Sequence, residues 1–66
     1  MILAGIRKEL IENENGEKSI YETKIVGSWE GNAFRCAEFV DDIFQGSTRI
    51  SKEEFDSQVF DVREVF

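Results

Sequence analysis

The side chains of this chain that could do chemistry are mostly carboxylates, because 14 acidic residues stand against 8 basic ones and there is no histidine. Without an imidazole, no Ser-His-Asp or Cys-His arrangement is possible, and histidine cannot serve as a base or a metal ligand. The carboxylates are spread along the chain, and their linear spacing singles out no acid–base pair. We therefore expect a protein that is not an enzyme and has no catalytic residues.

A metal site is the next chemistry to consider. Glu38, Asp41 and Asp42 have a spacing that would place them on one side of a helix. Carboxylates so placed are able to hold Mg²⁺ or Ca²⁺, but no EF-hand loop or other dedicated spacing supports such a site. Charge runs usually mark exposed surface, and the five glycines match no phosphate-binding motif. We expect neither a metal nor a cofactor.

Cys36 is the only cysteine, so an internal disulfide is excluded and a reducing compartment is favoured. It follows Arg35 near an expected helix start, where a thiol can become reactive. Its place among apolar residues instead predicts a small buried hydrophobic side chain. The chain has no signal-peptide pattern and no apolar window long enough to span a membrane, which predicts a soluble cytoplasmic protein.

The size and charge of the chain limit its partners. Sixty-six residues make one α+β domain, residues 1–66, near the lower limit for folding without a disulfide, metal or partner. The net charge of −6 disfavours contact with nucleic acid phosphates and with anionic lipid surfaces. No basic stripe with interleaved aromatic residues is present. We expect no direct binding to nucleic acid or membranes.

A hairpin must occupy the first half of the chain. Asn15-Gly16 is a strong signal for a two-residue type I′ turn, which requires positive φ at both central residues. Strands at 2–12 and 18–29 would flank it. The expected register gives a nearly continuous apolar stripe through the pairs Ile2–Trp29, Ala4–Gly27, Ile6–Ile25, Lys8–Thr23 and Leu10–Tyr21.

The middle of the chain has helical periodicity. Asn32 is a suitable N-cap and Gly46 a suitable left-handed C′ residue, which predicts a helix from Ala33 to about Gln45. One side of that helix would be apolar, comprising Ala33, Cys36, Ala37, Val40, Ile43 and Phe44.

The last twenty residues fit two structures. Ser51 and Glu54 form a capping box, and apolar residues follow at helical spacing. Residues 59–66 are rich in strand formers, which favours one helical turn at 51–56 and a strand at about 58–65 beside the first strand. The predicted fold is a small two-layer β-β-α-β sandwich, a three-stranded antiparallel sheet covered by one helix. A hairpin followed by two helices is the alternative.

All six phenylalanines follow residue 33, more than a small core readily holds. Exposed aromatics beside acids are typical of a protein-binding surface or a homodimer interface. We expect a non-catalytic acidic module that docks on a larger basic protein, such as a nucleic-acid-handling host protein. We expect it to act as an inhibitor or adaptor of the kind that phages and mobile elements encode. In the most specific form of this hypothesis, the acids imitate DNA phosphates. The expected binding residues are Glu38, Asp41, Asp42, Glu53, Glu54, Asp56, Phe60 and Phe66. The alternative is a structural homo-oligomer that pairs through a strand edge or an aromatic face.

Overall fold

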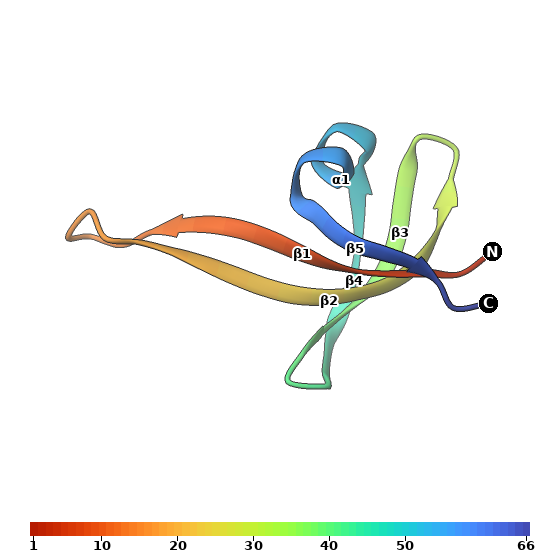
Figure 1. Ribbon diagram of the computed structural model, residues 1–66, viewed down its shortest axis with the longest axis horizontal. Helices are drawn as coiled ribbons and strands as arrows, with labels where there is room; N and C mark the ends of the chain where they lie inside the picture. The colour runs from red at the N-terminus through yellow and green to blue at the C-terminus, as the bar shows by residue number, and fades with distance from the viewer.

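Five antiparallel strands form one sheet in the computed structural model, which describes all 66 residues. The elements are β1 (Leu3–Glu12), β2 (Lys18–Glu30), β3 (Ala33–Val40), β4 (Ile43–Ser51), α1 (Lys52–Gln58) and β5 (Val59–Glu64). The strand order is β4-β3-β2-β1-β5, and α1 leads from the β4 edge of the sheet to its β5 edge (Figure 1). The predicted three-stranded sheet under one long helix is therefore wrong.

The region predicted as a helix, 33–45, is instead the strand β3, a turn and the start of β4. Its buried residues alternate rather than recur every three or four positions: Phe34 and Cys36 are buried while Arg35 between them is exposed. That two-residue period, together with pairing to β2 and β4, selects a strand. Asp41 and Asp42 have φ values of 51° and 64°, the positive values of a type I′ turn.

The expected helix cap is also part of a turn. Glu30 pairs with Ala33, so Gly31 and Asn32 form a two-residue connection between β2 and β3. Gly31 has a φ of 61°, which glycine adopts without steric cost. Asn32 therefore does not begin a helix.

The C-terminal prediction is confirmed. Ser51 caps α1, since its Oγ accepts a hydrogen bond from the Glu54 N–H at 3.2 Å. The chain then continues directly as β5, which pairs antiparallel with β1. The alternative of a second long helix is wrong, because the β-branched and aromatic residues after Gln58 complete the sheet.

The first hairpin exists as predicted, but its register does not. Ile6 lies opposite Lys24 rather than Ile25, and Leu10 lies opposite Ile20 rather than Tyr21. Residues directly opposite each other share a face, so this shift of one position changes which side chains are buried together. The expected apolar stripe is consequently broken up.

The turn explains that shift. It is a three-residue loop closed between Asn13 and Glu17, in which the Gly16 N–H donates to the Asn13 carbonyl at 3.0 Å. Gly16 has a φ of 79° and follows the turn as the left-handed residue of a bulge. The Asn13 Oδ1 accepts hydrogen bonds from the N–H groups of Asn15 and Glu17 at 2.9 and 3.0 Å. An Asn-Gly pair fits this loop as well as a type I′ turn.

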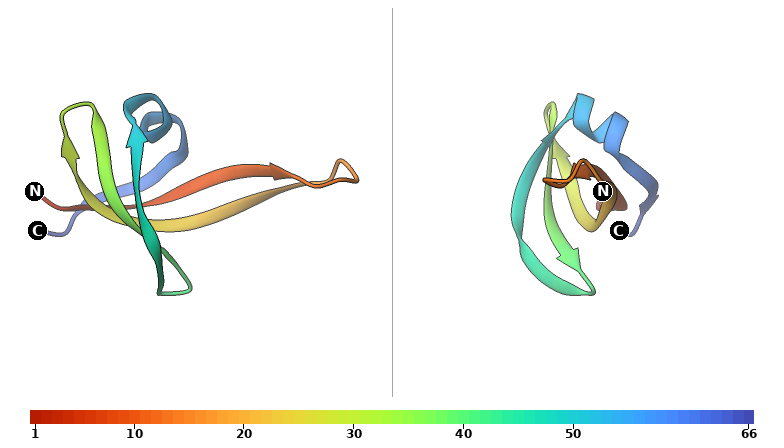
Figure 2. Two further views of the ribbon diagram at one scale, coloured as in Figure 1. Left: turned by 180° about the vertical axis from the view of Figure 1, so that it is seen from behind. Right: turned by 90° about the vertical axis from the view of Figure 1, so that its left-hand side faces the viewer.

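The sheet is curled, and α1 lies over one end of the curl (Figure 2). The buried core residues come from β2, β3, β4 and β5. The rings of Trp29, Phe34 and Phe55 lie against one another, with centroids 4.8 to 5.3 Å apart, and join α1 to β2 and β3. Phe34 also belongs to the buried cluster, which comprises Ile25, Phe34, Cys36, Ile50 and Val59, and Phe55 packs against that cluster.

The distal part of the first hairpin extends beyond the sheet. β5 pairs with β1 only as far as Arg7, and β3 pairs with β2 only from Lys24 onward. We call residues 8–22 the arm. Its two strands have only each other as partners, and it projects far from the rest of the molecule (Figure 1). The arm gives the molecule its elongated shape, 42 × 26 × 19 Å.

Candidate protein-binding site

The acidic residues expected to form one binding surface are separated in space. Three lie on α1: Glu53, Glu54 and Asp56. Asp41 and Asp42 form the β3–β4 turn, at the opposite end of the molecule from α1 (Figure 1). Glu38 lies on β3, half-buried within the curl of the sheet. The structure therefore does not assemble these carboxylates into a single patch.

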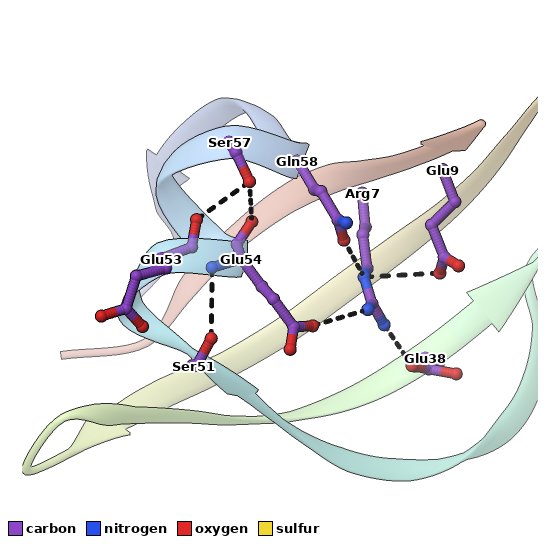
Figure 3. A network of polar contacts seen from close by, with 8 residues as sticks. All are labelled: Arg7, Glu9, Glu38, Ser51, Glu53, Glu54, Ser57 and Gln58. Atoms are coloured by element: carbon purple, nitrogen blue, oxygen red, sulfur yellow. Dashed lines mark hydrogen bonds and ion pairs between the residues drawn. The ribbon is translucent and has the colours of Figure 1, made fainter.

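Two of these acids converge on an arginine that the sequence did not single out (Figure 3). The Arg7 side chain is only 16% exposed. Its Nη2 donates to Glu54 Oε2 at 3.0 Å, and its Nε donates to Gln58 Oε1 at the same distance. Its Nη1 lies 3.6 Å from Glu38 Oε1, and its Nε lies 3.4 Å from Glu9 Oε1.

The Arg7 cluster, which comprises Arg7, Glu9, Glu38, Glu54 and Gln58, links three elements of the fold. One guanidinium joins β1 to β3 through Glu38 and to α1 through Glu54 and Gln58, using the planar fork that only arginine offers. Because both carboxylates already contact a cation, they are poorly placed to bind a partner. Lys52 similarly pairs with Asp56, at 3.0 Å. Among the α1 acids, Glu53 alone makes no ion pair.

Cys36 is buried as the sequence predicts, which removes it as a candidate nucleophile. Burial is the main cause that raises the pKa of its thiol to about 11; the nearby Glu38 carboxylate acts in the same direction and Arg7 in the opposite one. The thiol is therefore protonated at neutral pH, and a protonated thiol is a weak nucleophile. No group of His, Cys, Asp and Glu side chains is arranged to hold a metal ion.

The arm exposes apolar side chains instead. Leu10 and Ile20 lie opposite each other on one face and are 67% and 65% exposed. Phe60 on β5 continues this surface, and the Lys8 Nζ lies 4.9 Å from the centre of its ring. A shallow hollow of about 230 Å³ runs among these side chains and reaches Ser57 at the end of α1. We call Lys8, Leu10, Ile20 and Phe60 the arm patch.

The arm is apolar on its other face too. Ile11 and Tyr21 are 44% and 46% exposed there. Of the aromatic residues expected to bind a partner, Phe60 belongs to the arm patch. Phe66 is 88% exposed and lies beyond the end of β5, near the N-terminus. The structure thus connects only Phe60 with the arm.

Sequence reasoning missed the arm residues because it assigned Leu10 and Tyr21 to the buried stripe. The extension follows from the strand lengths in the structure: β2 has 13 residues and β3 has 8, so part of β2 extends past its neighbour. Both faces of that extension carry apolar residues, which is unusual for a ribbon in water.

Only one helix is present, and with seven residues it is far too short to cross a membrane. No protein-family model matches the chain, and neither a curated protein nor a solved structure matches it.

Proposed function

We propose that this chain is a non-catalytic protein-binding module whose docking element is the arm. The observation that supports the proposal is the exposure of Leu10 and Ile20 on a ribbon that no other element covers. A two-stranded hairpin is only marginally stable in water by itself. Contiguous exposed apolar side chains with a charged rim are characteristic of protein interaction sites. A partner that covers the arm patch would bury this surface and order the arm.

The charge of the arm indicates the kind of partner. Residues 8–22 contain five glutamates and two lysines, a net charge of −3. A partner with an apolar groove and a basic rim would complement this arrangement, and the charges would steer the encounter. A nucleic-acid-handling host protein has a surface of the required sign. Because the acids surround apolar side chains, we favour an apolar contact guided by charge over imitation of DNA phosphates.

The single free thiol fits a reducing compartment, so we place this function in the cytoplasm. The chain would act there as an inhibitor or adaptor of a larger protein.

A matched pair of substitutions tests the proposal. Leu10→Ser removes an apolar side chain from the arm patch, whereas Ile43→Ser removes one that is equally exposed, at 64%, from the start of β4. In pull-downs from host lysate, we expect Leu10→Ser to lose the captured protein and Ile43→Ser to retain it. Raising the salt concentration should weaken capture gradually, since charge guides the contact rather than forming it. Equal capture by the two variants would contradict the role of the arm.

A further inference from the structure

We propose that a second copy of this chain pairs with the free edge of β2 in the arm, so that two hairpins form one four-stranded ribbon. The pairing is antiparallel and centred on Ile20. This inference rests on the proposed function, because it takes the arm as the docking element. It concerns the free strand edge of the arm rather than the arm patch, and it names a second copy of the chain as the partner there.

The backbone of β2 offers the hydrogen-bonding groups for such a pairing. The Asn13 N–H donates to the Glu17 carbonyl at 2.9 Å, which closes the loop and sets the alternation along the hairpin. The backbone N–H and C=O groups of odd-numbered β2 residues then form hydrogen bonds with β1. Those of even-numbered residues point away from β1. Lys24 is the first residue of β2 with a partner in β3, since it lies opposite Phe39. The corresponding groups of Lys18, Ile20 and Glu22 face no strand, because β3 pairs only from Lys24 onward.

The side chains around Ile20 are self-complementary. When Ile20 lies opposite Ile20 of the second copy, Lys18 of each chain lies opposite Glu22 of the other. Both ends of the contact therefore join opposite charges across the strands, which stabilises an antiparallel pair. Lys18 makes no ion pair within the chain, so it is available for this contact. The two-fold symmetry uses the same surface on both copies, as in most homodimers.

The β1 edge of the arm has a similar pattern, with Lys8 and Glu12 on either side of Leu10, but it is less accessible. Val59 pairs with Arg7, so the partner's turn would meet the start of β5 immediately beyond Lys8. Lys8 is also engaged over the ring of Phe60. Its ion pair with Glu22, at 3.9 Å, involves one residue of each edge and does not distinguish the two. On β2, pairing with β3 starts at Lys24, so Thr23 separates Glu22 from the first paired residue. The structure therefore favours the β2 edge.

Pairing also changes the arm patch. Leu10 and Ile20 share a face with Lys8, Glu12, Lys18 and Glu22. In the four-stranded ribbon, Leu10 and Ile20 of both copies form one continuous apolar row, with charges of alternating sign on either side. A three- or four-stranded ribbon with an apolar face is more stable than a lone hairpin. The dimer would present a doubled docking surface while the face of the patch stays open.

Cysteine cross-linking tests which edge pairs. In the proposed register, the two Ile20 Cα atoms form a hydrogen-bonded pair about 5.5 Å apart, within the usual range for disulfides. Mild oxidation of Ile20→Cys should give a covalent dimer. Leu10→Cys is the matched control, because it is equally exposed, lies directly opposite in the same hairpin and reports on the β1 edge. Cys36 stays in place, since it is buried and its thiol is protonated.

The outcomes of that experiment separate the alternatives. A dimer with Ile20→Cys and little with Leu10→Cys supports pairing at β2. Equal or faster cross-linking of Leu10→Cys would overturn the choice of edge. No cross-link with either variant, in protein whose circular dichroism is unchanged, would overturn the pairing altogether.

Charge reversal gives an independent test that keeps Ile20 intact. Lys18→Glu and Glu22→Lys each place like charges opposite each other at both ends of the contact, so each variant should dimerise about tenfold more weakly. Mixing the two variants restores opposite charges and should restore the dimer. Arg49→Glu, an equal charge change on exposed β4, is the control. Sedimentation from about 10 µM to about 1 mM measures the mass. A wild-type monomer throughout, or a mixture no tighter than its components, would refute the pairing.

The failure of this inference is distinguishable from failure of the proposed function. Lys18→Glu leaves the arm patch and the five glutamates of the arm unchanged, so its capture of a partner from lysate tests the arm patch without the dimer. Capture without dimerisation would leave the proposed function standing and remove only the second copy.

Discussion

The two halves of the β1–β2 hairpin differ in how much of their apolar surface is buried. Ile25 and Ile20 are the same residue type on the same strand, five positions apart. Ile25 is fully buried, whereas Ile20 is 65% exposed. Two causes combine: the two side chains lie on opposite faces of β2, and β3, β5 and α1 cover the first half of the hairpin but end before the second. The exposed half is therefore the part available for contacts with other molecules.

The largest difference in stability is expected when the same substitution is made in each half of the hairpin. Ile25→Ala should cost about 2–5 kcal/mol through lost burial and a cavity, whereas Ile20→Ala should change stability by no more than about 0.5 kcal/mol. A core of this size supplies only about 3–5 kcal/mol, so Ile25→Ala should leave much of the chain unfolded. Urea denaturation followed by tryptophan fluorescence measures both. A large loss from Ile20→Ala in dilute protein would show that the arm is part of the cooperative fold.

The Arg7 cluster provides the next test, since it ties α1 to the covered half of the hairpin. Arg7→Met should destabilise the protein by about 2 kcal/mol, because three carboxylates then lose their common cation. This loss is smaller than for a fully buried ion pair because the carboxylates are partly exposed to solvent. Arg35→Met is the control. Arg35 is 64% exposed and pairs only with Glu30, so we expect a change within about 0.5 kcal/mol. Thermal and urea unfolding should rank the two variants the same way.

Cys36 gives a pH-dependent signature of the covered half. Burial raises its pKa from 9.0 to about 11, so the folded state favours the protonated thiol. The resulting stability is complete below pH 9.0 and is lost as the pH rises through about 11. Between roughly pH 8.5 and 10.5, the wild type should lose about 1–2 kcal/mol more than Cys36→Ala. Parallel pH profiles for the two proteins would contradict burial of the thiol.

The smallest effect on global stability should come from the arm loop. Asn13→Ala removes the acceptor of two loop hydrogen bonds, yet we expect a global change within about 0.5 kcal/mol because the loop lies far from the core. Hydrogen exchange should nevertheless accelerate at the amides of Ser19 and Tyr21, with Ile25 unchanged, since the arm opens locally. Faster exchange at Ile25 would mean that the two halves open together.

Local signals in the sequence predicted some elements well. The capping box at Ser51 and the strand formers after Gln58 identified α1 and β5, because both depend on nearby residues. The Asn15-Gly16 pair located the first turn. The register was wrong because this pair fits two loop lengths, and that choice moves every opposite residue by one position.

The missed strands show where local reasoning fails. Residues 33–45 fit a helical stripe as well as a two-residue alternation, and pairing with β2 on one side decided between them. The same limit applies to the candidate site. Phe60 was identified from its aromatic character, whereas Leu10 and Ile20 required knowledge of where β3 and β5 stop. Arg7 was not identified because the predicted register placed Ile6, rather than Arg7, on the same face as the buried Ile25.

The two ends of the chain lie side by side, which has a practical consequence. The Ile2 N–H donates to the Phe66 carbonyl, and the Val65 N–H donates to the Ile2 carbonyl, each at 2.8 Å. Both ends lie across the molecule from the tip of the arm (Figure 1). The domain is therefore suited to grafting into a surface loop of a carrier protein, entering and leaving at nearly one point. A carrier or fluorescent reporter joined there would display the arm outward without touching it.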